Sequence, residues 1–406
     1  MPREALSRCL LCRGARALCG SKLCPFLSYW RAFRDIRLPK AEVLEAPSPP
    51  SIFVGRTGYP RVRVAPAVVA EDGQADLYDY PERWLNLSLD EILRMRISLV
   101  RGCLKVDVDK PYMLEEAKLI AASSKPVDLE FRFSKPPKLS LSLDLHAPPL
   151  GPVGYVEKLR LLDNPKIPKP VEKVIEEPEV KAVDAVWSLY SNNVPVSQIQ
   201  RLFSVGAFGS PNNRRIVPTR WSITAVDDII SKRLLKMVKR LPIFDRYLFF
   251  ERKFMKNTFI AIIAPEAWSY EWIEAWFPYT TWNPDSEVEV EGDWEDYFGR
   301  TSYASLGGCY YAARLATAEF MLRERRQGTA ILIREIYEGF FLPIGVWFVR
   351  ENLREMFRSK PEKYDSLKEV LERLSKATRL PLSTWLSTST LLRILRSQSR
   401  LEVPVP

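Results

Sequence analysis

Four cysteines are clustered at the start of the chain, in the run CLLCRGARALCGSKLCP: Cys9, Cys12, Cys19 and Cys24. Two more, Cys103 and Cys309, are spread over the rest of the sequence. Four thiolates that coordinate one metal can fold a segment that is too short to bury a core of its own. The cluster therefore predicts a small metal-binding module at the chain start.

The metal itself is open from the residues. Zinc, as Zn2+, suits four thiolates, and an iron–sulfur cluster is the alternative because Pro25 directly follows the last cysteine. The gaps after Cys12 and Cys19 differ from the paired Cys-x2-Cys spacing of zinc ribbons. Two disulfides are disfavoured, since nothing else in the sequence indicates secretion.

The 406 residues exceed what one ordinary core accommodates, so at least two domains are expected. No apolar run is long enough to cross a bilayer, and the basic N-terminus lacks the apolar stretch of a signal peptide. We therefore expect a cytoplasmic protein without membrane contact, in which thiols stay reduced and available for metal.

Positive charge is concentrated at the N-terminus. Residues 1–40 carry nine Lys or Arg against two acidic residues, a net charge of +7 out of +10 for the chain. Arg13, Arg16 and Lys22 lie inside the cysteine cluster itself. Basic side chains neutralise phosphates, so nucleic acid is the favoured partner, and a solvated arm without a partner is the alternative.

Apolar periodicity predicts an α+β protein, with mixed helices and mostly antiparallel sheets behind the small N-terminal metal-binding module. We expect the module in residues 1–38, a Pro-rich linker in 39–50, an N-terminal α+β domain in 51–290 and a C-terminal α+β domain with a helical tail in 291–406. VDLEFRF and KLSLSLDLHAPP alternate as strands do, and the latter ends near His146, the single histidine of the chain. Residues 81–123 are expected to be partly helical, and 343–349 to form a strand.

Three segments carry candidate binding residues. Arg56 lies in a Gly-x-x-Gly turn that suits either a phosphate or a plain hairpin. Two short helices between Ala182 and Phe208 resemble a helix-turn-helix, in which Gln198, Gln200 and Arg201 would face outward to read DNA, although ordinary helical corners share this pattern. In RRIVPTRWSITAVDD, cations and an indole gather as a phosphate or nucleotide site would require: Arg214, Arg215, Arg220 and Trp221.

Carboxylates follow that segment. Asp227 and Asp228 are either metal ligands or acids that complement a helix dipole, and Glu319 is a further member of a possible acidic site. Trp268, Trp272 and Trp276 recur every four residues, as in a helix, and such a stripe is expected to belong to a core or a domain interface. No P-loop, dinucleotide-binding glycine motif or nuclease signature is present.

Several blocks resemble the archaeal Nre family of DNA-repair proteins: the CxxC…CG…CP start, FVGRTGYPRVRVAP, RRIVPTRWSITAVDD, GGCYYAARLATAEF and REIYEGFFLPIGVWFVRE. The similarity extends from Cys9 to about Leu395. It implies a two-part organisation, a role in the response to DNA damage and the replication sliding clamp as partner. In this family clamp binding is attributed to a C-terminal Gln-x-x-aliphatic-x-x-aromatic-aromatic motif.

The tail QSRLEVPVP matches that motif in part, because Gln398 and Leu401 occupy the first two anchor positions. Pro404 and Val405 stand where two aromatic residues belong. The preferred interpretation is a DNA-repair protein that binds DNA through its basic metal module and its arginines and interacts with the clamp. The alternatives are a nuclease or transferase with a site around Arg220 and Asp227, and a non-catalytic scaffold linked to the clamp.

Overall fold

The computed structural model describes residues 40–69, 75–138, 151–177, 179–278, 280, 282–283, 285–340 and 344–398. The described residues divide into two compact units, with Ile230 the last residue of the first and Ser231 the beginning of the second. Helix α8 (Thr219–Val238) runs through this boundary. None of the helices in these residues is long and apolar enough to cross a membrane.

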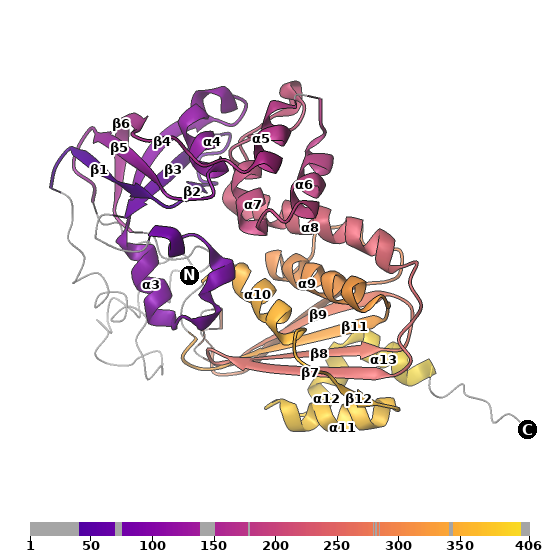
Figure 1. Ribbon diagram of the computed structural model, residues 1–406. Coiled ribbons are helices and arrows are strands. Elements are labelled where there is room, and N and C mark those ends of the chain that lie inside the picture. The colour runs from indigo at the N-terminus through magenta and orange to yellow at the C-terminus, as the bar shows by residue number, and fades with distance from the viewer. Residues whose placement is uncertain are drawn as a thin grey trace, which may run out of the picture. The chain divides into compact units, whose positions relative to one another are not determined.

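The N-terminal unit is built on a six-stranded sheet in the order β1-β5-β6-β4-β3-β2 (Figure 1). Neighbouring strands are antiparallel except β4 and β6, which are parallel. Alternation places one face inward, as in β5, where residues 127, 129, 131 and 133 are buried. The strands are β1 (Val43–Ser48), β2 (Ile52–Val54), β3 (Arg61–Val69), β4 (Leu99–Asp107), β5 (Val127–Phe133) and β6 (Val153–Leu161).

Helices accompany this sheet. Ser88 and Glu91 form a capping box that starts α3, each side chain meeting the other residue's backbone N–H. The α-helices are α3 (Leu89–Ser98), α4 (Glu115–Ala122), α5 (Lys169–Glu176), α6 (Ala182–Ser191), α7 (Val196–Ser204) and the first part of α8. Short 3-10 turns are η1 (Ala75–Leu77), η2 (Pro81–Asn86), η3 (Pro111–Leu114) and η4 (Pro211–Asn213).

The C-terminal unit has a second six-stranded sheet, in the order β10-β9-β11-β8-β7-β12. Only β9 and β11 are parallel neighbours in it. Every residue of β8 and β11 is buried, which explains their continuous apolar runs. The strands are β7 (Tyr247–Phe254), β8 (Asn257–Ala264), β9 (Ser269–Trp276), β10 (Glu289–Glu295), β11 (Thr329–Ile336) and β12 (Glu362–Tyr364).

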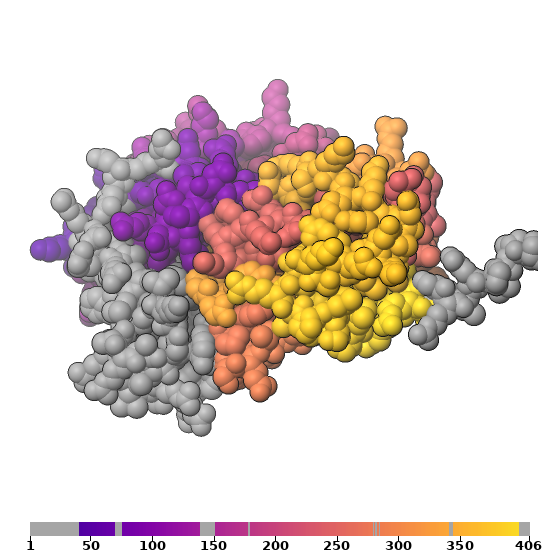
Figure 2. Space-filling view, turned by 90° about the horizontal axis from the view of Figure 1, so that it is seen from below, coloured from indigo at the N-terminus to yellow at the C-terminus, as the bar shows by residue number. Residues whose placement is uncertain are grey.

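Helices cover both faces of the second sheet. In Figure 1, α9 and α10 lie on one side and α11 and α12 on the other, where α13 also packs. Figure 2 views the molecule from below, and the C-terminal helices appear there in yellow. Trp385 is fully buried among the residues between these helices and the sheet. The helices are α9 (Gly308–Glu324), α10 (Trp347–Met356), α11 (Leu367–Ala377), α12 (Leu382–Thr388) and α13 (Thr390–Gln398).

The expected α+β class, with mostly antiparallel sheets, is confirmed. The metal-binding module and its four cysteines lie outside the described residues, as do His146 and nearly all of the expected KLSLSLDLHAPP strand. The three tryptophans at four-residue spacing are buried, as expected of a core. Trp272 and Trp276 belong to strand β9, because residues four apart share a face in a strand as well as in a helix.

Three local expectations differ from the structure. Part of the expected linker is strand β1, an edge strand in which Pro47 is tolerated. The expected strand at 343–349 is wrong, since α10 begins at Trp347 and a short apolar run suits a buried helix equally well. Residues 99–107, expected to be partly helical, form β4.

The boundary between the units also differs from the expected division at residue 290. Strands β7, β8 and β9, expected in the N-terminal domain, belong to the second sheet, where β11 lies between β8 and β9. Hydrogen bonding between strands far apart in the sequence determines this division, and no local pattern encodes it.

Candidate nucleic-acid interface

An exposed pair of aromatic rings joins two distant segments of the N-terminal unit. The turn after β2 presents Tyr59, whose ring centroid lies 5.3 Å from that of Trp221 in the first turn of α8. The two side chains are 53% and 46% exposed. Flat rings on a surface offer stacking platforms for unpaired bases.

Backbone contacts hold this pair in place. The N–H of Val54, on the edge strand β2, donates a hydrogen bond of 2.8 Å to Oγ1 of Thr219 at the start of α8. Gly58 has φ +87°, and a Cβ there would lie 2.9 Å from the carbonyl oxygen of Arg61. Only glycine suits that position, which shapes the turn that carries Tyr59.

The predicted arginines near this pair fall into two groups. Arg56 in the turn and Arg220 beside Trp221 are exposed. Arg214 is half-buried, and its Nε donates a hydrogen bond of 2.7 Å to the carbonyl oxygen of Gly209. Arg215 is exposed and donates from Nη1 to the carbonyl oxygen of Arg214 at 3.0 Å. Arg214 therefore shapes the loop before α8, while Arg56 and Arg220 are open to a ligand.

A second exposed group lies on the open face of the first sheet. Arg63 of β3 is the register partner of Lys105 of β4, so two cations stand directly opposite each other. Both lie over the ring of Tyr155 on β6, at 5.9 Å for the Arg63 Cζ and 5.5 Å for the Lys105 Nζ. Like charges placed opposite one another are destabilising, and a bound phosphate would relieve that repulsion.

Cys103 lies between these side chains. It is the register partner of Tyr155 and stands two residues before Lys105 on the same face of β4. Burial raises the pKa of its thiol, and the charges of Arg63 and Arg101 act against that shift. The thiol is therefore a buried floor beneath the cations and not a reactive group.

The three predicted carboxylates are not assembled into one group. Asp227 is fully buried and accepts a hydrogen bond of 2.9 Å from Nε2 of Gln200, which joins α8 to α7. Asp228 is half-buried on the same helix. Glu319 belongs to the C-terminal unit, where its Oε1 lies 2.6 Å from Nη2 of Arg354. Within the described residues, no three His, Cys, Asp or Glu side chains form a group that could hold a metal ion.

The helix-turn-helix resemblance is confirmed in outline by α6 and α7, but its outward-facing residues are not. Gln198, Gln200 and Arg201 are 2%, 7% and 6% exposed. Gln198 donates to the carbonyl oxygen of Ala122, and Arg201 to that of Asp79. These polar side chains bond inside the unit, so the expected reading of a DNA groove by α7 is wrong.

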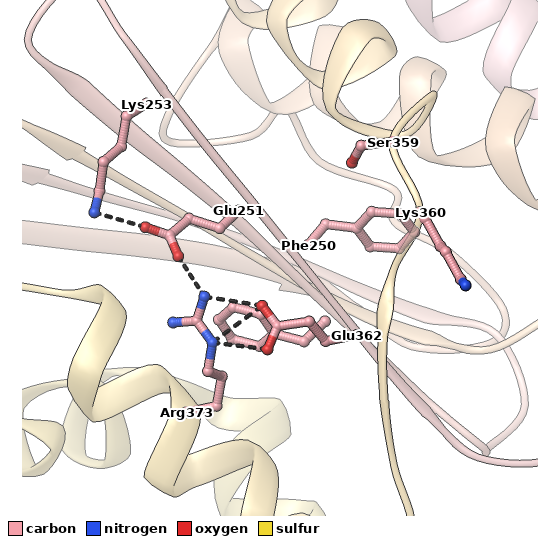
Figure 3. Close-up of a pocket in the computed structure, with 8 residues that line it drawn as sticks. Phe250, Glu251, Lys253, Ser359, Lys360, Glu362 and Arg373 are labelled. Carbon is pink, nitrogen blue, oxygen red and sulfur yellow. Dashed lines mark hydrogen bonds and ion pairs between the residues drawn. The ribbon is translucent and has the colours of Figure 1, made fainter.

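The pocket in Figure 3 lies in the C-terminal unit, between β7, β12 and α11. Arg373 stands in it between two carboxylates, with Nη2 at 2.6 Å from Glu251 Oε2 and 2.9 Å from Glu362 Oε1. Lys253 pairs with the other oxygen of Glu251 at 2.8 Å. Because these charges already compensate one another, the pocket offers little to a charged ligand.

Several predicted residues fall outside the described part of the chain, namely Arg13, Arg16, Lys22 and Leu401, together with the four cysteines. Gln398 is the last residue of α13. The sequence analysis missed Tyr59, Arg63, Lys105 and Tyr155. A signal for Arg63 was present in the alternation RVRV, since burying Val62 and Val64 leaves the arginines on the open face.

Comparison with known proteins identifies the family. Residues 18–283 match the model described as archaeal Nre, N-terminal, and residues 295–403 match that described as archaeal Nre, C-terminal. The chain therefore belongs to the archaeal Nre family. The gap between the two matches lies close to the expected division at residue 290 and not at the boundary between the compact units.

Curated relatives carry repair names. The chain is 44% identical over 385 residues to "DNA repair protein NreB" of Archaeoglobus fulgidus, which covers 95% of this chain and 97% of that protein. It is 35% identical to "DNA repair protein NreA" of the same organism, over 91% of this chain and 93% of the relative. For "DNA repair protein NreA" of Haloferax volcanii the identity is 35%, over 77% of each chain. No solved structure matches.

Proposed function

We propose that this protein acts in DNA repair, in the cytoplasm, and binds DNA through the open face of its N-terminal unit. The exposed Tyr59–Trp221 pair carries the proposal, because it lies beside cations that a solvent-facing surface does not need for folding. The repair names of relatives that match nearly the whole chain support the same function.

Single-stranded DNA fits this surface better than duplex DNA does. Unpaired bases stack on aromatic side chains, whereas Arg56, Arg220, Arg63 and Lys105 neutralise the backbone phosphates. Neither contact depends on base identity, so the surface should bind with little sequence preference. The burial of Asp227 favours binding over metal-dependent cleavage at this site.

Fluorescence anisotropy with a labelled single-stranded oligonucleotide tests the surface. Tyr59→Ala and Trp221→Ala should each weaken binding by about 1–3 kcal/mol, the usual contribution of one base–aromatic stack. Tyr112→Ala is the matched control, because Tyr112 is 65% exposed in the same unit and outside both groups. Unchanged affinity in Tyr59→Ala and Trp221→Ala would sink the proposal.

The N-terminal module belongs to the same proposal. Cys9, Cys12, Cys19 and Cys24 supply four thiolates, the donor set that tetrahedral zinc prefers, and Arg13, Arg16 and Lys22 add charge for DNA. Elemental analysis of the purified chain should find about one zinc per molecule. Iron with inorganic sulfide would indicate the cluster instead, and a chain without metal would overturn both.

The sliding clamp is the proposed protein partner, through Gln398 and Leu401. The two missing aromatic anchors should weaken such an interaction by roughly 1.5–3 kcal/mol each. A pull-down with the clamp of the source organism tests this. Capture that persists unchanged after residues 398–406 are deleted would contradict binding through the tail.

A further inference from the structure

A buried cluster of positive charge lies in the N-terminal unit, next to the proposed DNA surface. Arg101 of β4 and Arg201 of α7 are 5% and 6% exposed. Both act on the charge of Asp79, as does Arg96 of α3. Arg96 also lies over the ring of Trp84, with its Cζ 5.1 Å from the ring centroid. The cluster therefore contains three guanidinium groups and one carboxylate.

Asp79 satisfies only part of this cluster. Its Oδ2 lies 3.4 Å from Nη1 of Arg201, and its backbone carbonyl accepts from the same nitrogen at 2.7 Å. The Nε and Nη2 atoms of Arg201 are buried and make no hydrogen bond. The same is true of Nε and Nη1 of Arg101. Four buried donors thus point to no acceptor.

Other buried arginines of the described residues do not share this deficit. Arg314 lies 2.8 Å from Glu295, Arg334 lies 3.0 Å from Glu274 and Arg350 lies 3.1 Å from Glu351. A buried charge without a partner costs several kcal/mol, so chains normally pair it. The deficit around Asp79 is therefore specific to this place in the fold.

We propose that Arg96, Arg101 and Arg201 form a binding site for a phosphate group. Three guanidinium groups less one carboxylate leave a charge of +2, which matches a phosphate dianion. Its oxygens would accept from the donors of Arg101 and Arg201, in the way that arginine forks hold oxyanions. The side chain of Asp79 is 28% exposed, so solvent and ligands reach the cluster there.

Position on the sheet relates this site to the DNA surface. Arg101, Cys103 and Lys105 alternate along β4 and so share one face, the face that carries Arg63 and Tyr155. The charges of Arg63 and Arg101 both act on the thiol of Cys103. A phosphate at Arg101 is therefore free inorganic phosphate or the terminal phosphate of a DNA strand bound at Arg63 and Lys105. The second source rests on the proposed function.

Thermal unfolding of the full chain in phosphate, against chloride at equal ionic strength, tests the site. Phosphate should raise the Tm of the wild type, and calorimetric titration should show saturable binding. Arg101→Gln and Arg96→Gln should weaken phosphate binding at least tenfold. Arg94→Gln, which removes an exposed charge from the same helix as Arg96, should leave it unchanged.

Arg101→Met adds a readout that does not depend on the ligand. Without phosphate its Tm should equal or exceed that of the wild type, because it removes a buried charge that lacks a partner. A Tm well below the wild-type value in chloride would show that Arg101 is satisfied within the chain and would overturn the proposal. So would a wild type whose Tm does not respond to phosphate.

Two further arms separate the sources of charge. Glu71 and Asp72 lie in the undescribed segment 70–74. If only the Glu71→Gln/Asp72→Asn variant bound phosphate, the carboxylates of the chain would be the counter-charge and the proposal would fail. A 5′-phosphorylated oligonucleotide that binds more tightly than its 5′-hydroxyl form indicates the strand end. Phosphate binding without any DNA affinity would leave the site standing and refute the DNA surface.

Discussion

The ring of Tyr59 lies 5.3 Å from the ring of Trp221, and this contact joins a turn between two strands to a helix that begins far downstream. The two residues come from separate blocks that carry the family resemblance, FVGRTGYPRVRVAP and RRIVPTRWSITAVDD. Their meeting on an exposed surface gives those blocks a shared physical role, since neither ring is needed to fill a core.

Neutralising the opposed cations should separate binding from stability. We expect Arg63→Gln and Lys105→Gln each to reduce DNA affinity and to lower the salt slope of binding by about one unit for each lost phosphate contact. Stability should rise by about 0.2–1 kcal/mol, because the like-charge repulsion across β3 and β4 is removed. Anisotropy titrations at several salt concentrations and urea unfolding measure both. A salt slope equal to that of the wild type would contradict the assignment.

The hydrogen bond between Gln200 and Asp227 should be a matter of stability. Asp227→Ala leaves the buried amide of Gln200 without its acceptor and should lower the free energy of unfolding by about 1–3 kcal/mol. DNA affinity should not change, because Asp227 is fully buried. Urea unfolding and anisotropy on the same preparation test this. Normal stability combined with lost activity on a nucleic acid would instead assign Asp227 a catalytic role.

The segment that matches the C-terminal family model should not fold by itself. Residues 295–403 contain β11 but not its neighbours β8 and β9, so both hydrogen-bonding edges of β11 would be bare. We expect that fragment to be insoluble or unfolded, and residues 231–406 to unfold cooperatively. Circular dichroism during heating of both fragments decides. A cooperatively folded 295–403 fragment would refute the assigned division.

Acid should weaken the C-terminal unit through the Arg373 ion pairs. Hydrogen bonds from Arg373 hold the pKa of Glu362 below its ordinary value of 4.5. For Glu251, burial acts to raise the pKa, but hydrogen bonds from Lys253 and Arg373 outweigh it and the net pKa is lowered. A carboxyl whose pKa is lower in the folded state stabilises above its unfolded pKa and loses that contribution as the pH falls through the folded value.

The stabilisation by Glu362 should therefore be complete above pH 4.5 and should decline below it. Because the Glu362 side chain is 46% exposed, its pair contributes on the order of 0–1 kcal/mol. Unfolding of the wild type and of Glu362→Gln between pH 3 and pH 7, chosen as about the range around the ordinary Glu pKa, measures the difference. The two curves should converge at low pH. Curves that stay parallel would contradict the linkage.

Local patterns predicted the elements better than the site. The alternation of VDLEFRF correctly indicated strand β5, and the helical breaks near Asn192 correctly separated α6 from α7. The apolar face of α7 was also recognised. Its polar residues Gln198, Gln200 and Arg201 were placed in solvent, because a nine-residue helix does not reveal how many other elements surround it.

The sequence by itself determined the class of fold, the family and the four-cysteine module, because these depend on the order and spacing of neighbouring residues. Tertiary structure alone decided that Tyr59 meets Trp221, that Lys105 faces Arg63 and that three arginines share Asp79. It also placed the unit boundary, through the pairing of β11 with β8 and β9. Such contacts join residues that are remote along the chain, and strand pairing and burial bring them together without leaving any local periodicity.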